Sequence, residues 1–372
     1  MPLREARAAG SQLLRWYRRH RRDLPWRRTR DPYRIWVSEI MLQQTTVRAV
    51  VPYYRRFLRR FPSLPALAAA RFSRVLASWS GLGYYRRARH LHQAARTIMT
   101  AHGGQFPRTP REILALPGIG RYTAGAVLSI AFGRREPVLD GNVARVLSRL
   151  MLQRGDPRVR SNETRLWEAA RSLVESSSAP GDLNQALMEL GATLCTPLAP
   201  GCPRCPLARR CLARAAGVEE KIPPPRRRRS TVTLRQKVAL VQKGDRLLMR
   251  RREATGLMDG LWEFPALSAG RGPASDRLRL APQVRLATVR HSITYRRLLV
   301  EVHRARLLAE PRGGSYRWVD PRRLADIPVS SLAAKILAAC DPSAVAAGSP
   351  RRTRARRARV AAPPPRLSGI RR

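Results

Sequence analysis

Four of the five cysteines in this chain lie between residues 195 and 211, in the spacing C-x6-C-x2-C-x5-C. Four prolines alternate with them, which restricts the backbone of this segment to a tight loop of defined shape. Four thiolates so close together can bind one centre, either a tetrahedral zinc ion or a [4Fe-4S] cluster. The spacing alone leaves both metals open. The ligands are Cys195, Cys202, Cys205 and Cys211.

This cysteine pattern does not resemble the disulfide framework of a secreted protein, and reduced thiols suit metal binding in the cytosol. The remaining cysteine, Cys340, stands apart, and we expect it to be buried or unreactive. The chain has no apolar run long enough to span a membrane and no apolar signal-peptide core after its basic N-terminus. We therefore expect a cytoplasmic protein, associated with the nucleoid, that does not bind membranes.

The hydrophobic periodicity divides the chain into four segments. Residues 1–215 carry apolar side chains at three- and four-residue spacing, which predicts an all-α region. Residues 216–231 contain three consecutive prolines and then four arginines, a composition typical of a linker. In residues 232–340 two apolar runs flank the turn Lys243-Gly244-Asp245, which predicts a β-hairpin that opens an α/β domain. Residues 341–372 are expected to be a disordered basic tail, either a phosphate-binding segment or a dispensable one.

The chain is strongly basic, with 73 Lys+Arg against 25 Asp+Glu and a formal net charge of +48. Such a charge favours a polyanionic partner, above all nucleic acid. Only four of the basic residues are lysines, so a codon bias toward arginine is an alternative explanation. The charge supports nucleic-acid binding without proving it.

Residues 116–120 (LPGIG) separate two predicted helices. Gly118 and Gly120 allow the backbone to approach a ligand closely, and free amides at the start of the second helix can bind a phosphate. The alternative is an ordinary tight turn between two helices. An aspartate follows shortly afterwards, in residues 139–143 (LDGNV).

Together these two motifs resemble the helix-hairpin-helix and Gly/Pro-Asp signature of the endonuclease III superfamily. Residues 183–192 (LNQALMELGA), which run into Cys195, resemble the helix before the cluster loop in the same repair glycosylases. The resemblance implies a [4Fe-4S] cluster rather than zinc. It also implies a six-helix part at about 28–138 and an iron-sulfur part made of 1–27 plus 139–215.

Residues 36–45 (WVSEIMLQQT) closely resemble the catalytic helix of MutY-type adenine DNA glycosylases. A lone helical glutamate is usually only solvated, but the resemblance implies that Glu39 protonates adenine at N7. It implies that Asp140 stays ionised and stabilises the positively charged sugar, although Asp140 also suits the N-cap of the next helix. Tyr122 stands where bifunctional relatives carry a nucleophilic lysine, so we expect hydrolysis by water. Tyr122 and Asn142 should line the same pocket.

To reach adenine, a glycosylase must turn the nucleotide out of the duplex and fill the gap. Residues 81–85 (GLGYY) match the family segment that does this, which implies that Tyr84 wedges beside the opposite base. Leu82, Gln44 and Thr45 are expected to hold the opened site. The alternative for Leu82 is an ordinary core position.

In the C-terminal part, residues 260–265 (GLWEFP) resemble the Nudix-like domain that recognises 8-oxoguanine in MutY-type proteins. Asp276 is the only acidic residue between Pro265 and Val300, so we expect no nucleotide hydrolysis. The family's lesion-reading triplet is replaced here by residues 293–295 (ITY). His291 and Thr294 are the expected DNA contacts of this loop.

These observations predict a multidomain protein: an all-α helix-hairpin-helix glycosylase domain with an iron-sulfur cluster loop, followed by a smaller α/β Nudix-like domain. The expected activity is monofunctional base excision repair, on adenine opposite 8-oxoguanine or guanine in double-stranded DNA, by a monomer. The alternatives are a thymine-mismatch or endonuclease III-like glycosylase, and a catalytically silent iron-sulfur protein that binds damaged DNA.

Overall fold

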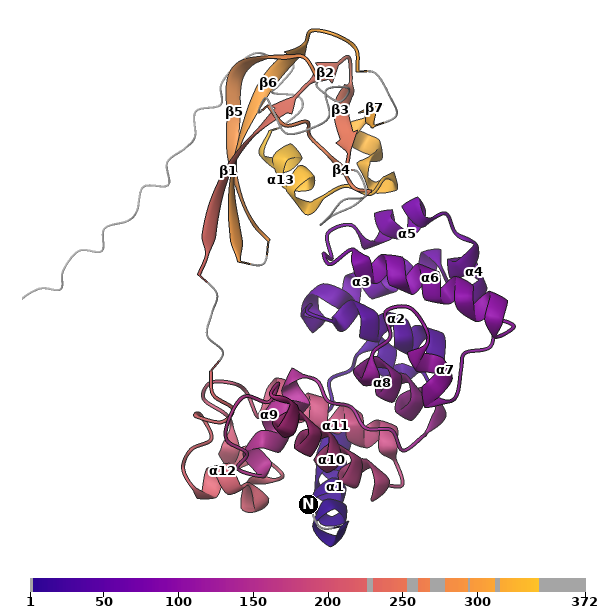
Figure 1. Cartoon of the computed structure of the whole chain (residues 1–372), viewed down its shortest axis with the longest axis vertical. Coiled ribbons are helices and arrows are strands. Elements are labelled where there is room, and N and C mark those ends of the chain that lie inside the picture. Colours follow the sequence, from indigo (N-terminus) through magenta and orange to yellow (C-terminus); the bar gives the residue numbers. More distant parts are fainter. Residues whose placement is uncertain are drawn as a thin grey trace, which may run out of the picture.

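The protein consists of a helical N-terminal part followed by a β-rich C-terminal part, as seen in a computed structural model (Figure 1). The structure describes residues 3–225, 230–252, 260–267, 278–293, 295–311 and 315–340. The expected tail at 341–372 lies outside the described residues, and so does Asp276. The prediction of helices first and a mixed α/β part second is confirmed.

Helices make up the described N-terminal part up to residue 215. They are α1 (Leu3–His20), η1 (Pro25–Arg28), α2 (Pro32–Leu42), α3 (Val47–Arg60), α4 (Leu64–Ala69), α5 (Phe72–Trp79), α6 (Arg86–Ala101), α7 (Pro110–Leu114), α8 (Arg121–Phe132), α9 (Gly141–Leu150), α10 (Arg160–Glu175), α11 (Pro180–Thr193), η2 (Cys202–Arg204), η3 (Ala208–Arg210) and α12 (Leu212–Ala215).

Two helix starts show how local sequence positions the later site. Asp31 caps α2 by accepting hydrogen bonds from the backbone amides of Tyr33 and Arg34, and Pro32 occupies the first helical position. The Asp-Pro pair favours a helix start at this point, because a carboxylate satisfies free amides and proline needs no partner there. α2 is then buried along almost its whole length and packs against α8.

Close helix packing joins the elements that come from distant parts of the chain. α1 packs against α10 and α11, and α11 packs in turn against α8 and α9. At the α11–α8 contact, a Cβ on Gly181 would lie 2.5 Å from the carbonyl oxygen of Ser129. Glycine is therefore required there, and it lets α11 approach the helix that follows the hairpin.

The described residues of the C-terminal part form two sheets and one α-helix. In the first sheet, β6 (Arg296–Leu307) lies between β1 (Val232–Leu240), which is parallel to it, and β5 (Leu280–Ile293), which is antiparallel. The second sheet contains β2 (Gln242–Lys243), β3 (Arg246–Arg251), β4 (Trp262–Glu263) and β7 (Tyr316–Val319). The 3₁₀ helix η5 (Pro321–Asp326) and α13 (Ser331–Ala339) follow.

The predicted hairpin at residues 243–245 is present, but its first strand is shorter than expected. Of the first apolar run, residues 238–240 belong to β1 and pair with β6, and the strand of the hairpin that pairs with β3 is Gln242–Lys243. An apolar run does not specify which strand it pairs with, so this partner could not be predicted. Cys340 is 4% exposed, in agreement with the expectation of a buried thiol.

The connection between the two parts is partly packed. In the expected linker of 216–231, Ile222 is buried and its carbonyl accepts a hydrogen bond of 2.7 Å from Arg149 Nε. The first half of the segment therefore lies against the helical part, because a buried guanidinium needs acceptors. Leu261 is fully buried in the apolar core of the helical part, close to α5.

Candidate active site

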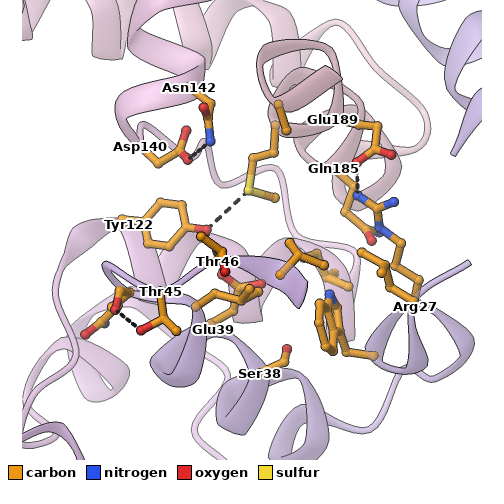
Figure 2. Close-up of a pocket in the computed structure, with 18 of the residues that line it drawn as sticks. Arg27, Ser38, Glu39, Thr45, Thr46, Tyr122, Asp140, Asn142, Gln185 and Glu189 are labelled. Carbon is orange, nitrogen blue, oxygen red and sulfur yellow. Dashed lines mark hydrogen bonds and ion pairs between the residues drawn. The ribbon is translucent and has the colours of Figure 1, made fainter. Parts of the chain in front are cut away.

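A cavity of about 720 Å³ opens in the helical part between α2, α8, the start of α9 and α11 (Figure 2). Its lining includes Glu39, Tyr122, Asp140 and Asn142, the residues expected to form the catalytic pocket. Glu39 comes from α2, whereas the other three come from α8 and the start of α9, about 80 to 100 positions later in the chain. The structure therefore brings the predicted set together.

Glu39 lies on α2 with only 4% of its surface exposed. Its Oε2 accepts a hydrogen bond of 2.6 Å from the Tyr122 hydroxyl, which also lies 3.2 Å from Met188 Sδ. Burial raises the pKa of Glu39 to about 7, and the nearby Asp140 adds to the rise while the Tyr122 hydrogen bond opposes it. A carboxyl in this state can hold a proton at neutral pH and release it to a ligand.

Asp140 caps the N-terminus of α9, as the alternative interpretation of this residue proposed, and it also lines the cavity. Its carboxylate accepts hydrogen bonds from the Val143 amide at 2.7 Å and from Asn142 Nδ2 at 2.9 Å. Burial raises the pKa of Asp140, whereas these hydrogen bonds and Arg145 lower it. The capping bonds thus counteract the cost of holding a negative charge in the pocket.

The position of Asn142 depends on α11. A Cβ on Gly191 would lie 2.7 Å from Asn142 Cβ and 2.9 Å from its carbonyl oxygen, so the two helices touch through their backbones. Arg145 Nη2 bridges them by donating to Asn142 Oδ1 at 2.9 Å and to the Gly191 carbonyl at 2.7 Å. This contact sets where the start of α9, and with it Asp140, lies in the cavity.

The cavity also contains an ionic cluster that the sequence interpretation missed. Glu189 on α11 is fully buried and accepts hydrogen bonds from Arg22 Nε at 2.8 Å and Arg27 Nη2 at 2.8 Å. Burial by itself would raise the pKa of Glu189, but these hydrogen bonds outweigh it and lower the pKa to about 2. The single acidic residue of the 183–192 segment was the one available signal. Nothing marked the arginines as its partners.

The predicted hairpin is formed by α7, residues 115–120 and α8. Gly118 has a φ of +75°, and a Cβ there would lie 2.5 Å from His90 Cβ, so both backbone freedom and space require glycine. Gly120 is the N-cap of α8 and provides no side-chain hydrogen bond to the first amides of the helix. Those amides are available for an anion, as expected for a phosphate-binding hairpin.

Two loops carry the residues expected to open the duplex. Gln44 and Thr45 line the cavity, and Tyr84 is 46% exposed. Gln44 and Tyr84 both have left-handed backbones, with φ of 57° and 49°. Leu82 is 7% exposed and packs in the helical core, which matches its alternative interpretation. A contact between Leu82 and DNA stays a prediction.

The four clustered cysteines lie around η2 and η3, each partly buried and with a free thiol. Burial, followed by the charges of Cys195, Cys211 and Cys202, raises the pKa of Cys205, so the four sulfur atoms are close enough to interact. Arg149 Nη1 donates to Cys195 Sγ at 3.3 Å. In the described part of the chain, no group of three or more His, Cys, Asp or Glu side chains is arranged to hold a metal ion.

In the C-terminal part, the expected lesion-reading loop is the turn between β5 and β6. Thr294 lies outside the described residues. His291 is half-buried, and its Nε2 lies 3.5 Å from Ser331 Oγ at the start of α13. Its side chain thus faces its own domain, and a DNA contact by His291 stays a prediction. No helix within the described ranges has the length and apolar character needed to cross a membrane.

Two family models match the chain. Residues 37–172 match the HhH-GPD superfamily of base excision DNA repair proteins, and residues 237–339 match the NUDIX domain. The first match lies within the helical part and the second within the β-rich part. They agree with the predicted helix-hairpin-helix domain and Nudix-like domain.

Known proteins of similar sequence are adenine DNA glycosylases. The Homo sapiens protein is 40% identical over 321 residues, which cover 71% of this chain and 58% of that protein. The Schizosaccharomyces pombe protein is 34% identical over 318 residues, which cover 69% of each chain. The chain thus spans little more than half the length of the human relative.

A solved structure of a thermostable thymine-DNA glycosylase also resembles the helical part. It is 32% identical, has a TM-score of 0.52, and the similarity covers 57% of this chain and 98% of that one. The similarity thus includes nearly all of that protein and little more than half of this chain.

Proposed function

The chain belongs to the adenine DNA glycosylase family, and on this basis we propose that it excises adenine mispaired with 8-oxoguanine or guanine from double-stranded DNA. The observation that carries the proposal is the buried Glu39 carboxyl, with a pKa of about 7, inside a cavity of about 720 Å³. Such a cavity can enclose one base turned out of the duplex.

Glu39 is proposed to act as the general acid. A purine leaves more easily once a ring nitrogen is protonated, and N7 is the position that the family resemblance implies. At neutral pH a carboxyl with a pKa of about 7 is protonated in a large fraction of molecules, so the proton is available without a large energetic cost. The Tyr122 hydrogen bond holds the carboxyl in one orientation while the base leaves.

Asp140 is proposed to stabilise the positive charge that develops on the sugar. Cleavage of a glycosidic bond through an oxocarbenium-like state requires one carboxyl that donates a proton and a second that remains negative. Hydrogen bonds from Val143 and Asn142 favour the ionised form of Asp140, whereas Glu39 has a single short donor. The surroundings of Asp140 thus favour the ionised form more strongly than those of Glu39, as the two proposed roles require.

The reaction is proposed to end with hydrolysis rather than strand cleavage. A glycosylase that also cuts the strand uses an amine to form a Schiff base with the sugar. Tyr122 occupies the position of that lysine, and all four lysines of the chain lie after residue 220. The helical part therefore contains no lysine at all, and water is the remaining nucleophile.

The cysteine loop is proposed to hold a [4Fe-4S] cluster through Cys195, Cys202, Cys205 and Cys211. The donor set is the one that such a cluster takes, four free thiols of one loop, and the Arg149 guanidinium beside Cys195 can offset thiolate charge. When bound, the cluster would supply cross-links that fold the loop. The exposed Arg204, Arg209 and Arg210 would then face DNA phosphates.

The proposed partner is a DNA duplex bound by a monomer at the nucleoid. The 118–120 hairpin would hold a phosphate, the exposed Tyr84 would enter the duplex, and the β5–β6 turn would contact the base opposite adenine. The ITY sequence of that turn departs from the family pattern. The degree of preference for 8-oxoguanine over guanine is thus a property of this chain that must be measured.

The decisive experiment is single-turnover base release from duplexes that differ only in the base opposite adenine. We expect adenine release opposite 8-oxoguanine and guanine, and its loss by several orders of magnitude in Glu39→Gln. Glu168→Gln, on the exposed surface of α10, is the matched control and should retain full activity. Release of thymine from a G·T pair would instead support the thymine-mismatch alternative. Damage-specific binding without any base release would support the silent DNA-binding alternative.

A further inference from the structure

Arg87, in the first turn of α6, makes several hydrogen bonds, although the proposed chemistry gives it no role. Its Nη1 donates to the carbonyls of Ile40 at 2.8 Å and Met41 at 2.9 Å, and it also contacts the Gln43 carbonyl. These are carbonyls at the C-terminal end of α2, which have no partner within the helix. Arg87 thus caps the helix that carries Glu39.

The other end of the guanidinium reaches two loops. Nη2 donates to Thr45 Oγ1 at 3.2 Å and to the Gly83 carbonyl at 3.2 Å. The guanidinium also lies against two aromatic rings, with its carbon 5.6 Å from the Trp79 centroid and 5.3 Å from the Tyr84 centroid. One side chain therefore joins the end of α2, the 43–45 loop and the 81–84 turn.

Both joined loops contain a strained residue. Gln44 has a φ of 57° and Tyr84 a φ of 49°, conformations that residues other than glycine rarely adopt. Such conformations persist where neighbouring contacts hold them in place. Gln44 lies between the two Arg87 partners Gln43 and Thr45, and Tyr84 directly follows Gly83 and stacks on Arg87 itself. The contacts that hold both strained residues thus come from the same guanidinium.

We propose that Arg87 is a positioning residue that fixes the 43–45 loop and the 81–84 turn in one rigid arrangement, so that both enter the duplex together when adenine is turned out. The inference rests on the proposed function, in which these loops open the DNA. A planar fork with five N–H donors can bond several carbonyls at fixed angles, whereas an ammonium group cannot. The positive charge of Arg87 alone is therefore insufficient for this role.

The test is Arg87→Lys, which keeps the charge and removes the fork. The matched control is Arg86→Lys, the same change at the neighbouring exposed position of α6. Single-turnover adenine release is measured on two duplexes, one with 8-oxoguanine opposite adenine and one with an abasic-site analogue there. We expect Arg87→Lys to slow release about 10- to 100-fold on the first duplex, the range typical of a misplaced reactive geometry. On the second we expect a much smaller loss, because no partner base has to be held apart.

A second readout does not depend on excision. The adenine analogue 2-aminopurine, placed next to the target adenine, fluoresces more strongly when its neighbour leaves the stack. With Glu39→Gln as a common background, Arg87→Lys should reduce this signal at saturating protein, and Arg86→Lys should not. If the wild type releases no adenine, the proposed function fails, while the fluorescence comparison still tests Arg87.

Equal losses on both duplexes, or an unchanged fluorescence signal, would overturn the inference, because a general folding defect or a purely structural role predicts them. Should Arg87→Lys fold poorly, Thr45→Val removes one partner of the guanidinium and Thr45→Ser retains it. The valine variant should show a smaller loss with the same dependence on the opposite base. Identical behaviour of the valine and serine variants would contradict the proposal.

Discussion

The Tyr122 hydroxyl donates a hydrogen bond of 2.6 Å to Glu39 Oε2 and so links α8, the helix after the hairpin, to α2. The hydrogen bond stabilises the ionised carboxylate and limits how far burial raises the pKa of Glu39, which comes to about 7. Burial raises the pKa of Tyr122 well above its ordinary value, so its hydroxyl remains a donor. The pair keeps Glu39 near the midpoint of its titration at neutral pH.

The pH dependence of adenine release follows from this value. A general acid must carry its proton, so the single-turnover rate should level off below pH 7, as long as Asp140 stays ionised, and fall about tenfold per pH unit well above pH 7. The measurement is release from an A·8-oxoguanine duplex at saturating protein, which separates chemistry from binding. A rate that increases between pH 7 and pH 9 would contradict the role of Glu39 as acid.

Tyr122→Phe should move this falling limb to higher pH. Loss of the hydroxyl removes the hydrogen bond that lowers the pKa of Glu39, while burial of the carboxyl remains. Phenylalanine keeps the ring and thus the shape of the pocket wall. Comparison of the wild-type and Tyr122→Phe pH profiles checks the direction, and a limb displaced to lower pH would show that the hydrogen bond acts differently.

Glu39→Gln should stabilise the folded protein at high pH. The folded pKa of about 7 lies above the ordinary value of 4.5, so the folded state binds the proton more tightly than the unfolded state. Below pH 4.5 the carboxyl is protonated in both states and costs the folded protein no stability. As the pH rises through 7, ionisation of the buried carboxyl progressively destabilises the folded state. Glutamine cannot ionise, so Glu39→Gln avoids this cost, which is about 3 kcal/mol of folding stability at pH 8. The melting temperature of Glu39→Gln should exceed that of the wild type at pH 8, with a smaller difference at pH 5.

Gly191→Ala should impair catalysis through Asn142. The added methyl would lie 2.7 Å from Asn142 Cβ, so the start of α9 must shift and carry Asp140 with it. Adenine release should fall about 100-fold, and overpacking should reduce stability by about 1–3 kcal/mol. Gly10→Ala on α1 is the matched control, since its methyl would meet Leu183 at an ordinary 3.7 Å. Equal activity of the two variants would exclude this packing argument.

Cys202→Ala should lose iron and weaken DNA binding before it affects the chemistry of any remaining folded protein. Removal of one of the four proposed ligands would open the cluster, and the loop that presents Arg204, Arg209 and Arg210 would lose its cross-links. Cys340→Ala, at the buried thiol outside the loop, is the control and should retain iron. The measurements are iron content and the dissociation constant for duplex DNA. A Cys202→Ala protein that lacks iron but binds DNA normally would refute the role of the loop.

Local patterns were sufficient for several features of the site. The start of α2 at Asp31 and Pro32, the hairpin glycines and the cap at Asp140 depend on residues a few positions apart, and the structure contains all of them. Contacts between residues far apart in the chain could not be predicted in this way. Glu189 binds Arg22 across 167 positions, and no periodicity marks such a pair. The parallel pairing of β1 with β6 was equally inaccessible, since strand order depends on the whole sheet.

The sequence by itself determined the family and the order of the two parts, and it singled out the two carboxyl residues that line the cavity, because these are carried by short motifs. Only the tertiary structure decided the pKa, and with it the protonation state, of these carboxyls. Burial raises the pKa of Glu39 to about 7, and the Tyr122 hydroxyl from α8 limits the rise. Arg87 acquires its partners only when α2, the 43–45 loop and the 81–84 turn meet. Desolvation and hydrogen bonding depend on all neighbours in space, and those neighbours are scattered along the chain.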